Sequence, residues 1–281
     1  MENALEVKNL SKHYPEFELD NINITLPAGC IMGFIGENGA GKSTTIKAIL
    51  DLIKKDSGEV TIFGQTNLSR NQKLKEHIGV VMDECSFPEN LNAKEIDKVM
   101  NNCYKTWNRT KYMKYLDKFA LSLKKPVKEY SRGMKMNLSI AVALSHDSKL
   151  LILDEATSGL DPIVRDEILD VFLDFIQDES HSIFISSHII SDLEKICDYI
   201  TFIHNGKIIL SEIKDELLDK YTIIKCSEAE YSTIDKSAII GRRKSRFGIE
   251  ALALKEKISN NIITDKVNIE DIMLYFVKGE E

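Results

Sequence analysis

The chain has 281 residues, a formal net charge of −7 at pH 7 and a hydrophobic fraction of 43%, which suits one large α/β domain with a smaller appendage. The acidic balance argues against a broad nucleic-acid-binding face, so we expect no nucleic-acid partner. No apolar run reaches the roughly 20 residues of a membrane span, no signal peptide is evident and the five cysteines lack metal-ligand spacing, so we expect a cytoplasmic chain with reduced thiols.

The first part of the chain is predicted to form strands around a glycine-rich loop. Residues 5–10 and 19–26 alternate between apolar and polar side chains, as half-buried strands do. The apolar run 30–35 predicts a buried strand, and residues 45–53 have the periodicity of a helix. The loop between that strand and that helix is therefore a candidate anion site at a helix N-terminus.

The loop itself matches the Walker A pattern Gly-x-x-x-x-Gly-Lys-Ser. Its glycines let the backbone curl so that N–H groups point inward at a phosphate. Lys42 can reach the β- and γ-phosphates, and Ser43 can offer its hydroxyl to Mg²⁺. The alternative is a glycine-rich turn without a ligand. The predicted strand before the loop and the predicted helix after it argue against that alternative. The candidate nucleotide-binding residues of this loop are Gly36, Glu37, Asn38, Gly39, Ala40, Gly41, Lys42, Ser43 and Thr44.

Further strands and helices alternate along the rest of the first 220 residues. Short strands are predicted at 59–63 and 78–82, and a helical region at about 90–146. Buried strands are predicted at 150–153 and 182–186, with an amphipathic helix at 162–178 between them. Asn205 and Gly206 join the strands 199–203 and 207–210 in a hairpin, and a charged helix at 213–220 is expected to close this domain.

Two carboxylates and a histidine follow the buried strands. The strand 150–153 delivers Asp154 and Glu155, which form a Walker B pair: Asp154 would hold Mg²⁺, and Glu155 would act as general base on a water molecule. A solvated strand end is the alternative for this pair. His188 follows the strand 182–186 at the edge where α/β sheets gather ligands, although a lone histidine there is more often structural.

The order of the motifs resembles that of the ATP-hydrolysing subunits of ATP-binding cassette (ABC) transporters. Besides Walker A, Walker B and His188, residues 131–135 (Ser-Arg-Gly-Met-Lys) match the family's signature, and 158–161 (Ser-Gly-Leu-Asp) match its D-loop. The resemblance covers residues 4–215 and implies an α/β P-loop NTPase core with an antiparallel β subdomain and the inserted helical subdomain. With the charged helix 213–220 as its end, residues 1–220 are expected to form the ABC domain.

The resemblance also implies roles for individual residues. His188 would contact the γ-phosphate, while Ser131, Arg132 and Gly133 would close over the ATP held by a second subunit. Ser131 could instead be a plain helix N-cap. Asp161 would bridge the two subunits, and Tyr14 would stack on adenine, with Phe17 as the competing candidate and ordinary core packing as the alternative for both.

Two departures from the family pattern concern the signature and the end of strand 78–82. Arg132 and Met134 replace the usual Gly and Gln, as in the signatures of ABC-2-type exporters. Asp83 stands where the family has a Gln that touches Mg²⁺, so Asp83 is a candidate metal ligand through water. Residues 87–91 would meet the coupling helix of a membrane subunit, or form an ordinary surface loop.

Residues 221–281 carry no motif and are predicted to form a small α+β accessory domain. The segment 221–226 is expected to be a strand and 267–277 a helix capped by Asn268, while 248–254 fits either element. The basic cluster 242–246 predicts a solvated face, with a contact to anionic lipid or nucleic acid as the alternative.

Together these features predict an ATPase subunit that uses ATP and Mg²⁺ and pairs with a second copy or a paralogue. It would drive a separate ABC-2-type permease, an exporter, from the inner face of the cell membrane. The alternatives are a soluble ABC ATPase acting on ribosomes or DNA, and a regulatory or immunity subunit with low turnover.

Overall fold

The computed structural model describes residues 3–246, 248–259 and 262–278. The chain divides into two compact units, Met1–Ser211 and Glu212–Glu281. The division falls before the charged helix α8 (Lys214–Lys220), which packs against β10 of the second unit, whereas the sequence expects this helix to close the first. Within the described residues, no helix is long and apolar enough to cross a bilayer.

The first unit contains the following elements. The strands are β1 (Asn3–Tyr14), β2 (Phe17–Pro27), β3 (Ile31–Ile35), β4 (Ser57–Ile62), β5 (Ile78–Val81), β6 (Leu150–Asp154), β7 (Ser182–Ser187), β8 (Tyr199–His204) and β9 (Lys207–Ile213), the last running across the division. The helices are α1 (Lys42–Ile49), α2 (Gln72–Lys75), α3 (Ala93–Cys103), α4 (Arg109–Lys118), α5 (Arg132–Ala143), α6 (Pro162–Phe175) and α7 (Ile190–Ile196), with short 3-10 turns at Leu68–Arg70 and Val127–Glu129.

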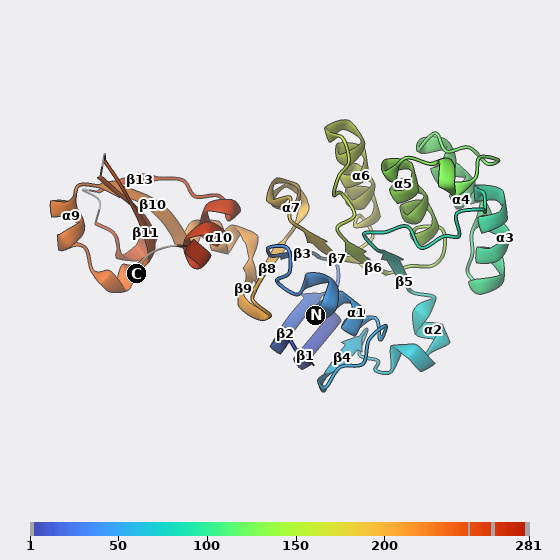
Figure 1. Ribbon diagram of the computed structural model, residues 1–281, viewed down its shortest axis with the longest axis horizontal. Helices are drawn as coiled ribbons and strands as arrows, with labels where there is room; N and C mark the ends of the chain where they lie inside the picture. The colour runs from blue at the N-terminus through green and yellow to red at the C-terminus, as the bar shows by residue number, and fades with distance from the viewer. Residues whose placement is uncertain (1–2, 247, 260–261, 279–281) are drawn as a thin grey trace. The chain divides into compact units, whose positions relative to one another are not determined.

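The central sheet has the strand order β5-β6-β7-β3-β8-β9, and β5, β6, β7, β3 and β8 are parallel. Strands β3, β6 and β7 are buried along their whole length, as parallel strands covered on both faces must be. Figure 1 shows α6 and α7 on one side of this sheet and α1 on the other. The register pairs Asp154 with Ser186 and Ile35 with Ser187, so the carboxyl ends of the three strands meet at one edge.

A separate antiparallel sheet, β2-β1-β4, packs against the same core and confirms the predicted β subdomain. Its buried side chains join the core formed by β3 and α1, where Phe34 and Phe184 contact each other with ring centroids 5.3 Å apart. The hairpin between β8 and β9 is also as predicted: Asn205 and Gly206 have φ values of 45° and 72°, which a two-residue turn of this hand requires.

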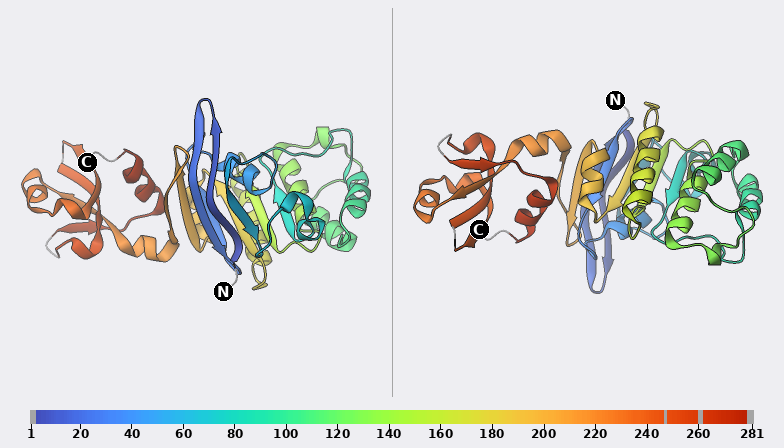
Figure 2. Two further views of the ribbon diagram at one scale, coloured as in Figure 1. Left: turned by 90° about the horizontal axis from the view of Figure 1, so that it is seen from below. Right: turned by 90° about the horizontal axis from the view of Figure 1, so that it is seen from above.

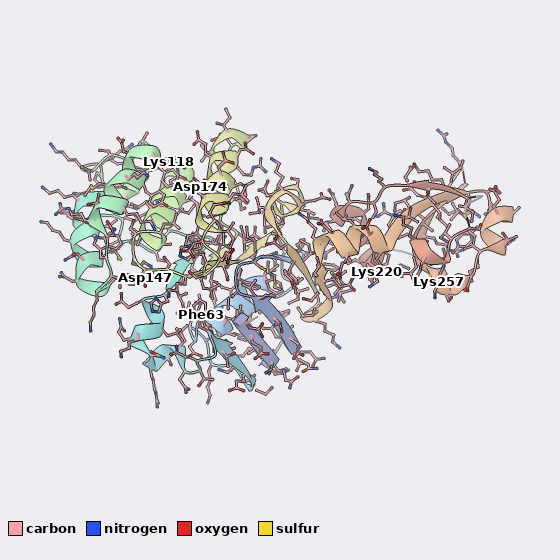
Figure 3. All side chains as sticks on the ribbon, turned by 180° about the vertical axis from the view of Figure 1, so that it is seen from behind. Phe63, Lys118, Asp147, Asp174, Lys220 and Lys257 are labelled. Carbon is pink, nitrogen blue, oxygen red and sulfur yellow. The ribbon has the colours of Figure 1, made fainter. Side chains whose placement is uncertain are left out.

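Helices α3, α4 and α5 gather beyond β5 at one end of the unit (Figure 2), in the region predicted to be helical. Glu76 ties this region to the core, because its buried carboxylate accepts hydrogen bonds from the N–H groups of Lys105 and Thr106 at 3.0 and 3.2 Å. Lys118 of α4 and Asp174 of α6 also lie close together (Figure 3), with Nζ and Oδ2 3.8 Å apart.

The second unit is a small α+β fold. Its strands are β10 (Tyr221–Cys226), β11 (Ile239–Ser245), β12 (Gly248–Leu254) and β13 (Ile263–Asp265), in the order β11-β12-β10-β13, and its helices are α8, α9 (Glu228–Thr233) and α10 (Ile269–Lys278), with 3-10 turns at Lys236–Ala238 and Lys255–Lys257. Asn268 caps α10 as predicted, since its Oδ1 accepts the Asp271 N–H at 2.8 Å.

The basic cluster of this unit belongs to β11, a strand that the sequence pattern does not predict. Strand β11 pairs with β12, so the ambiguous segment at 248–254 is also a strand. Arg242 lies over the Tyr231 ring and Arg243 over the Tyr275 ring, at 5.4 and 5.0 Å, and Lys244 pairs with Glu228. These contacts use the cationic side chains within the unit itself.

Candidate functional site

The phosphate loop wraps around the side chain of its own lysine. Lys42 is buried, and its Nζ donates to the carbonyl oxygen of Gly36 at 2.7 Å and of Glu37 at 3.3 Å. Gly41, which precedes α1, has a φ of 113°, and a Cβ there would lie 2.9 Å from Phe17 Cζ. Glycine is therefore required by backbone conformation and by space, which fixes the N–H groups at the start of the helix.

Lys42, Glu155 and His188 form one cluster at the carboxyl edge of the sheet. Lys42 Nζ lies 3.2 Å from Glu155 Oε1, and His188 Nδ1 lies 2.6 Å from Glu155 Oε2. The backbone N–H of His188 donates to the same Oε2 at 3.3 Å. Three residues predicted separately from the sequence thus lie together, with Lys42 and His188 holding the Glu155 carboxylate by its two oxygens.

The Glu155 backbone is held in an unusual conformation. Its φ of 54° lies in the left-handed region, which is uncommon and strained for a residue other than glycine. Its N–H donates to both the carbonyl and the hydroxyl oxygen of Ser186, each at 3.1 Å. The neighbouring strand therefore helps to hold the strained turn that aims the carboxylate at Lys42.

Ser186 is a positioning residue that the sequence analysis did not single out. Its fully buried hydroxyl donates to Asp154 Oδ1 at 2.6 Å while it accepts from the Glu155 N–H, so it fixes the carboxylate of Asp154 and the backbone of Glu155. The available signal was the pair of serines that ends the apolar strand β7, because a buried hydroxyl needs a partner.

The signature residues lie at the start of α5 and contact the D-loop of the same chain. Ser131 caps α5, with its Oγ accepting the Met134 N–H at 3.2 Å, so the N-cap reading is realised. A Cβ on Gly133 would lie 3.4 Å from Leu160 Cδ2. Asp161 caps α6 in turn, accepting the N–H groups of Ile163 and Val164 at 3.2 and 3.1 Å.

The two departures from the family pattern form an ion pair. Arg132 Nη2 lies 2.7 Å from Asp83 Oδ1, immediately after β5. About half of each side chain is exposed, in contrast to the Lys42–Glu155 pair, whose side chains are 6% and 11% exposed. Within the described residues, no group of three or more His, Cys, Asp and Glu side chains could hold a metal ion, so Asp83 belongs to no such group.

The two aromatic candidates for adenine differ in position. Tyr14 and Phe17 are cross-strand neighbours in the hairpin of β1 and β2. Phe17 lies against the phosphate loop at Gly41, whereas Tyr14 is 38% exposed, with Lys12 Nζ 5.3 Å from its ring.

This arrangement of a Walker A loop, a Walker B pair and a histidine on a parallel sheet defines a P-loop ATPase. Residues 19–158 match the family described as ABC transporter. The chain is 41% identical over 214 residues, 75% of its length, to the lantibiotic transport ATP-binding protein SrtF of Streptococcus pyogenes, of which it covers 91%. It is 30% identical over 287 residues to the uncharacterized ABC transporter ATP-binding protein YhcH of Bacillus subtilis, and this match spans 99% of the chain and 92% of that protein.

A solved structure of the ATP-binding subunit of an ABC transporter has the same fold, with a TM-score of 0.69 and 27% identity over 76% of this chain and 91% of that one. The chain therefore belongs to the ABC transporter family, as an ATP-binding and ATP-hydrolysing subunit. The match to YhcH covers 99% of the chain, so it includes nearly all of the second unit.

Proposed function

We propose that this protein binds ATP with Mg²⁺ in residues 36–44, hydrolyses it through Glu155 and pairs head-to-tail with a second ABC subunit. The cycle drives a separate ABC-2-type permease at the inner face of the membrane, for export. The relative SrtF is named for lantibiotic transport, which supports a role in transport and makes a lantibiotic the first substrate to test.

The observation that carries the proposal is the cluster of Lys42, Glu155 and His188. Glu155 is the general base: its carboxylate accepts the proton of the attacking water, and the strained backbone at φ 54° holds it in place. A triphosphate in the loop competes with Glu155 for Lys42, whose Nζ lies 3.2 Å from Oε1. His188, on the other carboxylate oxygen, keeps the base oriented and would contact the γ-phosphate.

Oxygen donors near the loop suit Mg²⁺, which prefers a few carboxylate or hydroxyl oxygens together with water and substrate phosphates. Ser43 lies in the first turn of α1, and α1 packs beside β6, which ends at Asp154. The hydroxyl of Ser43 and the carboxylate of Asp154 would hold the ion, which supplies charge neutralisation to the phosphates. Asp83 is engaged with Arg132, and this contact supports a different role for it.

The signature residues supply the surface for the second subunit's nucleotide. Ser131, Arg132 and Gly133 lie at the N-terminus of α5, whose N–H groups and dipole favour an anion. Arg132 adds a cation at the same place. Because ADP lacks the γ-phosphate, MgATP should hold two subunits together more tightly than MgADP.

An apolar hollow of about 470 Å³ supports a docking place for the permease. It lies between the core and the helical region, and its lining includes Leu52, Val80, Ser86 and Phe87. Leu52 and Val80 are 63% and 37% exposed beside this hollow, and apolar side chains gathered around a hollow are typical of an interaction site. The loop expected to meet a coupling helix, residues 87–91, begins at its rim.

The test is the association state of Glu155→Gln, which keeps the shape of the site and should turn ATP over far more slowly than wild type. Light scattering in MgATP, in MgADP and without nucleotide should show a dimer in MgATP alone. The same mass in all three conditions would contradict the interface, unless a paralogous subunit encoded beside this chain restores the MgATP-dependent complex.

A further inference from the structure

Asp83 and Arg132 are unusual in sequence, and they contact each other in space. The two positions are 49 residues apart, yet Arg132 Nη2 donates to Asp83 Oδ1 at 2.7 Å. Asp83 follows β5 in the core sheet, while Arg132 opens α5 in the helical region. The ion pair therefore joins two parts of the first unit at the point where the signature begins.

The guanidinium of Arg132 also lies against the D-loop. A Cβ added to Gly159 would lie 2.9 Å from Arg132 Nη1 and 3.1 Å from Cζ, so a side chain there would push the guanidinium aside. Gly159 also has a φ of 69°, a conformation that favours glycine. Arg132 thus lies between the carboxylate of Asp83, after β5, and the backbone of Gly159, after β6.

A second ion pair on the next turn of α5 acts on the same loop. Lys135 Nζ lies 3.4 Å from Glu89 Oε1, so α5 presents two cations, three residues apart, to two acids of the loop 83–89. Both pairs connect the start of the signature helix to the segment that begins at Asp83.

We propose that Asp83 is a positioning residue for the signature: it orients the Arg132 guanidinium against Gly159 and so sets where the signature meets the second subunit's ATP. In this proposal Asp83 orients Arg132 and does not bind the metal ion, contrary to the expectation from the sequence. The inference rests on the proposed function, because the signature acts only when a second subunit brings ATP to it.

The chemistry predicts a modest and salt-sensitive effect. The side chains are 47% and 55% exposed, and ion pairs so exposed to water contribute little. We expect the pair to change turnover about threefold, within the range of such contacts. Salt at about 1 M shortens the screening length to roughly 3 Å and should reduce the difference between variant and wild type.

The experiment is a double-mutant cycle on ATP hydrolysis by the full chain, with Asp83→Asn, Arg132→Gln and the double variant. Asp83→Asn should lower kcat about threefold at low salt with an unchanged Mg²⁺ half-saturation. The double variant should be no slower than Arg132→Gln alone, because the partner that Asp83 orients is already absent. Asp174→Asn is the control: it removes another exposed ion pair of the helical region, with Lys118, which has no contact described with the signature, and it should leave kcat unchanged (Figure 3).

Three results would overturn the inference: a shifted Mg²⁺ half-saturation in Asp83→Asn, losses that multiply in the double variant, or wild-type kcat in Asp83→Asn. A wild-type chain without ATPase activity would contradict the proposed function instead. In that case the same substitutions, single and combined, are made in Glu155→Gln, and the fraction of MgATP-dependent dimer is measured in place of kcat. If the losses of dimer caused by Asp83→Asn and Arg132→Gln add up in the double variant, the positioning role is overturned there too.

Discussion

Two ionic contacts in the first unit link motifs that are distant in sequence, and they differ in burial. The Lys42–Glu155 pair is nearly closed off from water, with side chains 6% and 11% exposed, whereas Asp83 and Arg132 are about half exposed. A buried charge that loses its partner is strongly destabilised, while an exposed one is rehydrated at little cost. The buried cluster is therefore suited to catalysis, and the exposed pair is suited to small changes in the position of the signature.

The largest effect is expected at Lys42. Lys42→Ala leaves the β- and γ-phosphates without their cation and removes one of the two partners of the buried Glu155 carboxylate, the one at 3.2 Å. ATP hydrolysis should become undetectable and nucleotide binding should weaken, as measured by a coupled phosphate assay and by calorimetry. Wild-type turnover in this variant would contradict the phosphate-loop assignment.

A substitution of Ser186 should have an intermediate effect on turnover. It tests whether the hydrogen bonds of this buried serine matter for activity or only its packing. Ser186→Ala removes the hydroxyl that binds Asp154 at 2.6 Å and the Glu155 N–H at 3.1 Å. Losing a group that positions metal-site carboxylates typically lowers activity roughly 10- to 100-fold, and we expect kcat to fall within that range.

Ser187→Ala is the matched control for Ser186. Ser187 is equally buried, but its Oγ accepts only the nearby Ile189 N–H among the contacts described for it, at 3.0 Å. Its kcat should stay within a few-fold of wild type by the same reasoning. Equal losses in both variants would show that Ser186 acts through general packing.

The smallest effect on turnover, but a clear effect on stability, is expected where Glu76 and His146 tie the helical region to the core. Burial lowers the pKa of His146 below its ordinary 6.5. Burial alone would raise the pKa of Glu76, but hydrogen bonds from Lys105 and Thr106 outweigh it and hold this pKa below 4.5.

In both cases the unfolded chain binds the proton more readily, so stability rises with pH. The contribution of His146 should be complete above pH 6.5 and be lost as the pH falls through its lowered folded-state pKa; that of Glu76 should be lost below pH 4.5. Urea denaturation should show a falling midpoint below pH 6.5, and His146→Gln should flatten this slope. An unchanged slope would assign the pH dependence to other groups.

Much of this arrangement could be predicted from the sequence, because each motif is local. The Walker loops, the strands that carry them and the hairpin at Asn205 and Gly206 depend on short-range patterns, and the structure has these elements. The pairing of Asp83 with Arg132 and the double contact of Ser186 depend on which strands and helices become neighbours, which no local pattern contains. For the same reason, strand β11 was missed: its charged residues owe their place to the pairing with β12.

The most direct test of the account is single-turnover and steady-state hydrolysis by Glu155→Gln beside wild type. The amide keeps the size of the side chain and cannot accept the proton from water. We expect MgATP to bind with near wild-type affinity while turnover falls roughly a hundredfold or more, within the usual range for loss of a general base. Turnover close to wild type would contradict the claim that the buried cluster around Glu155 performs the chemistry, and would make His188 the next candidate for the base.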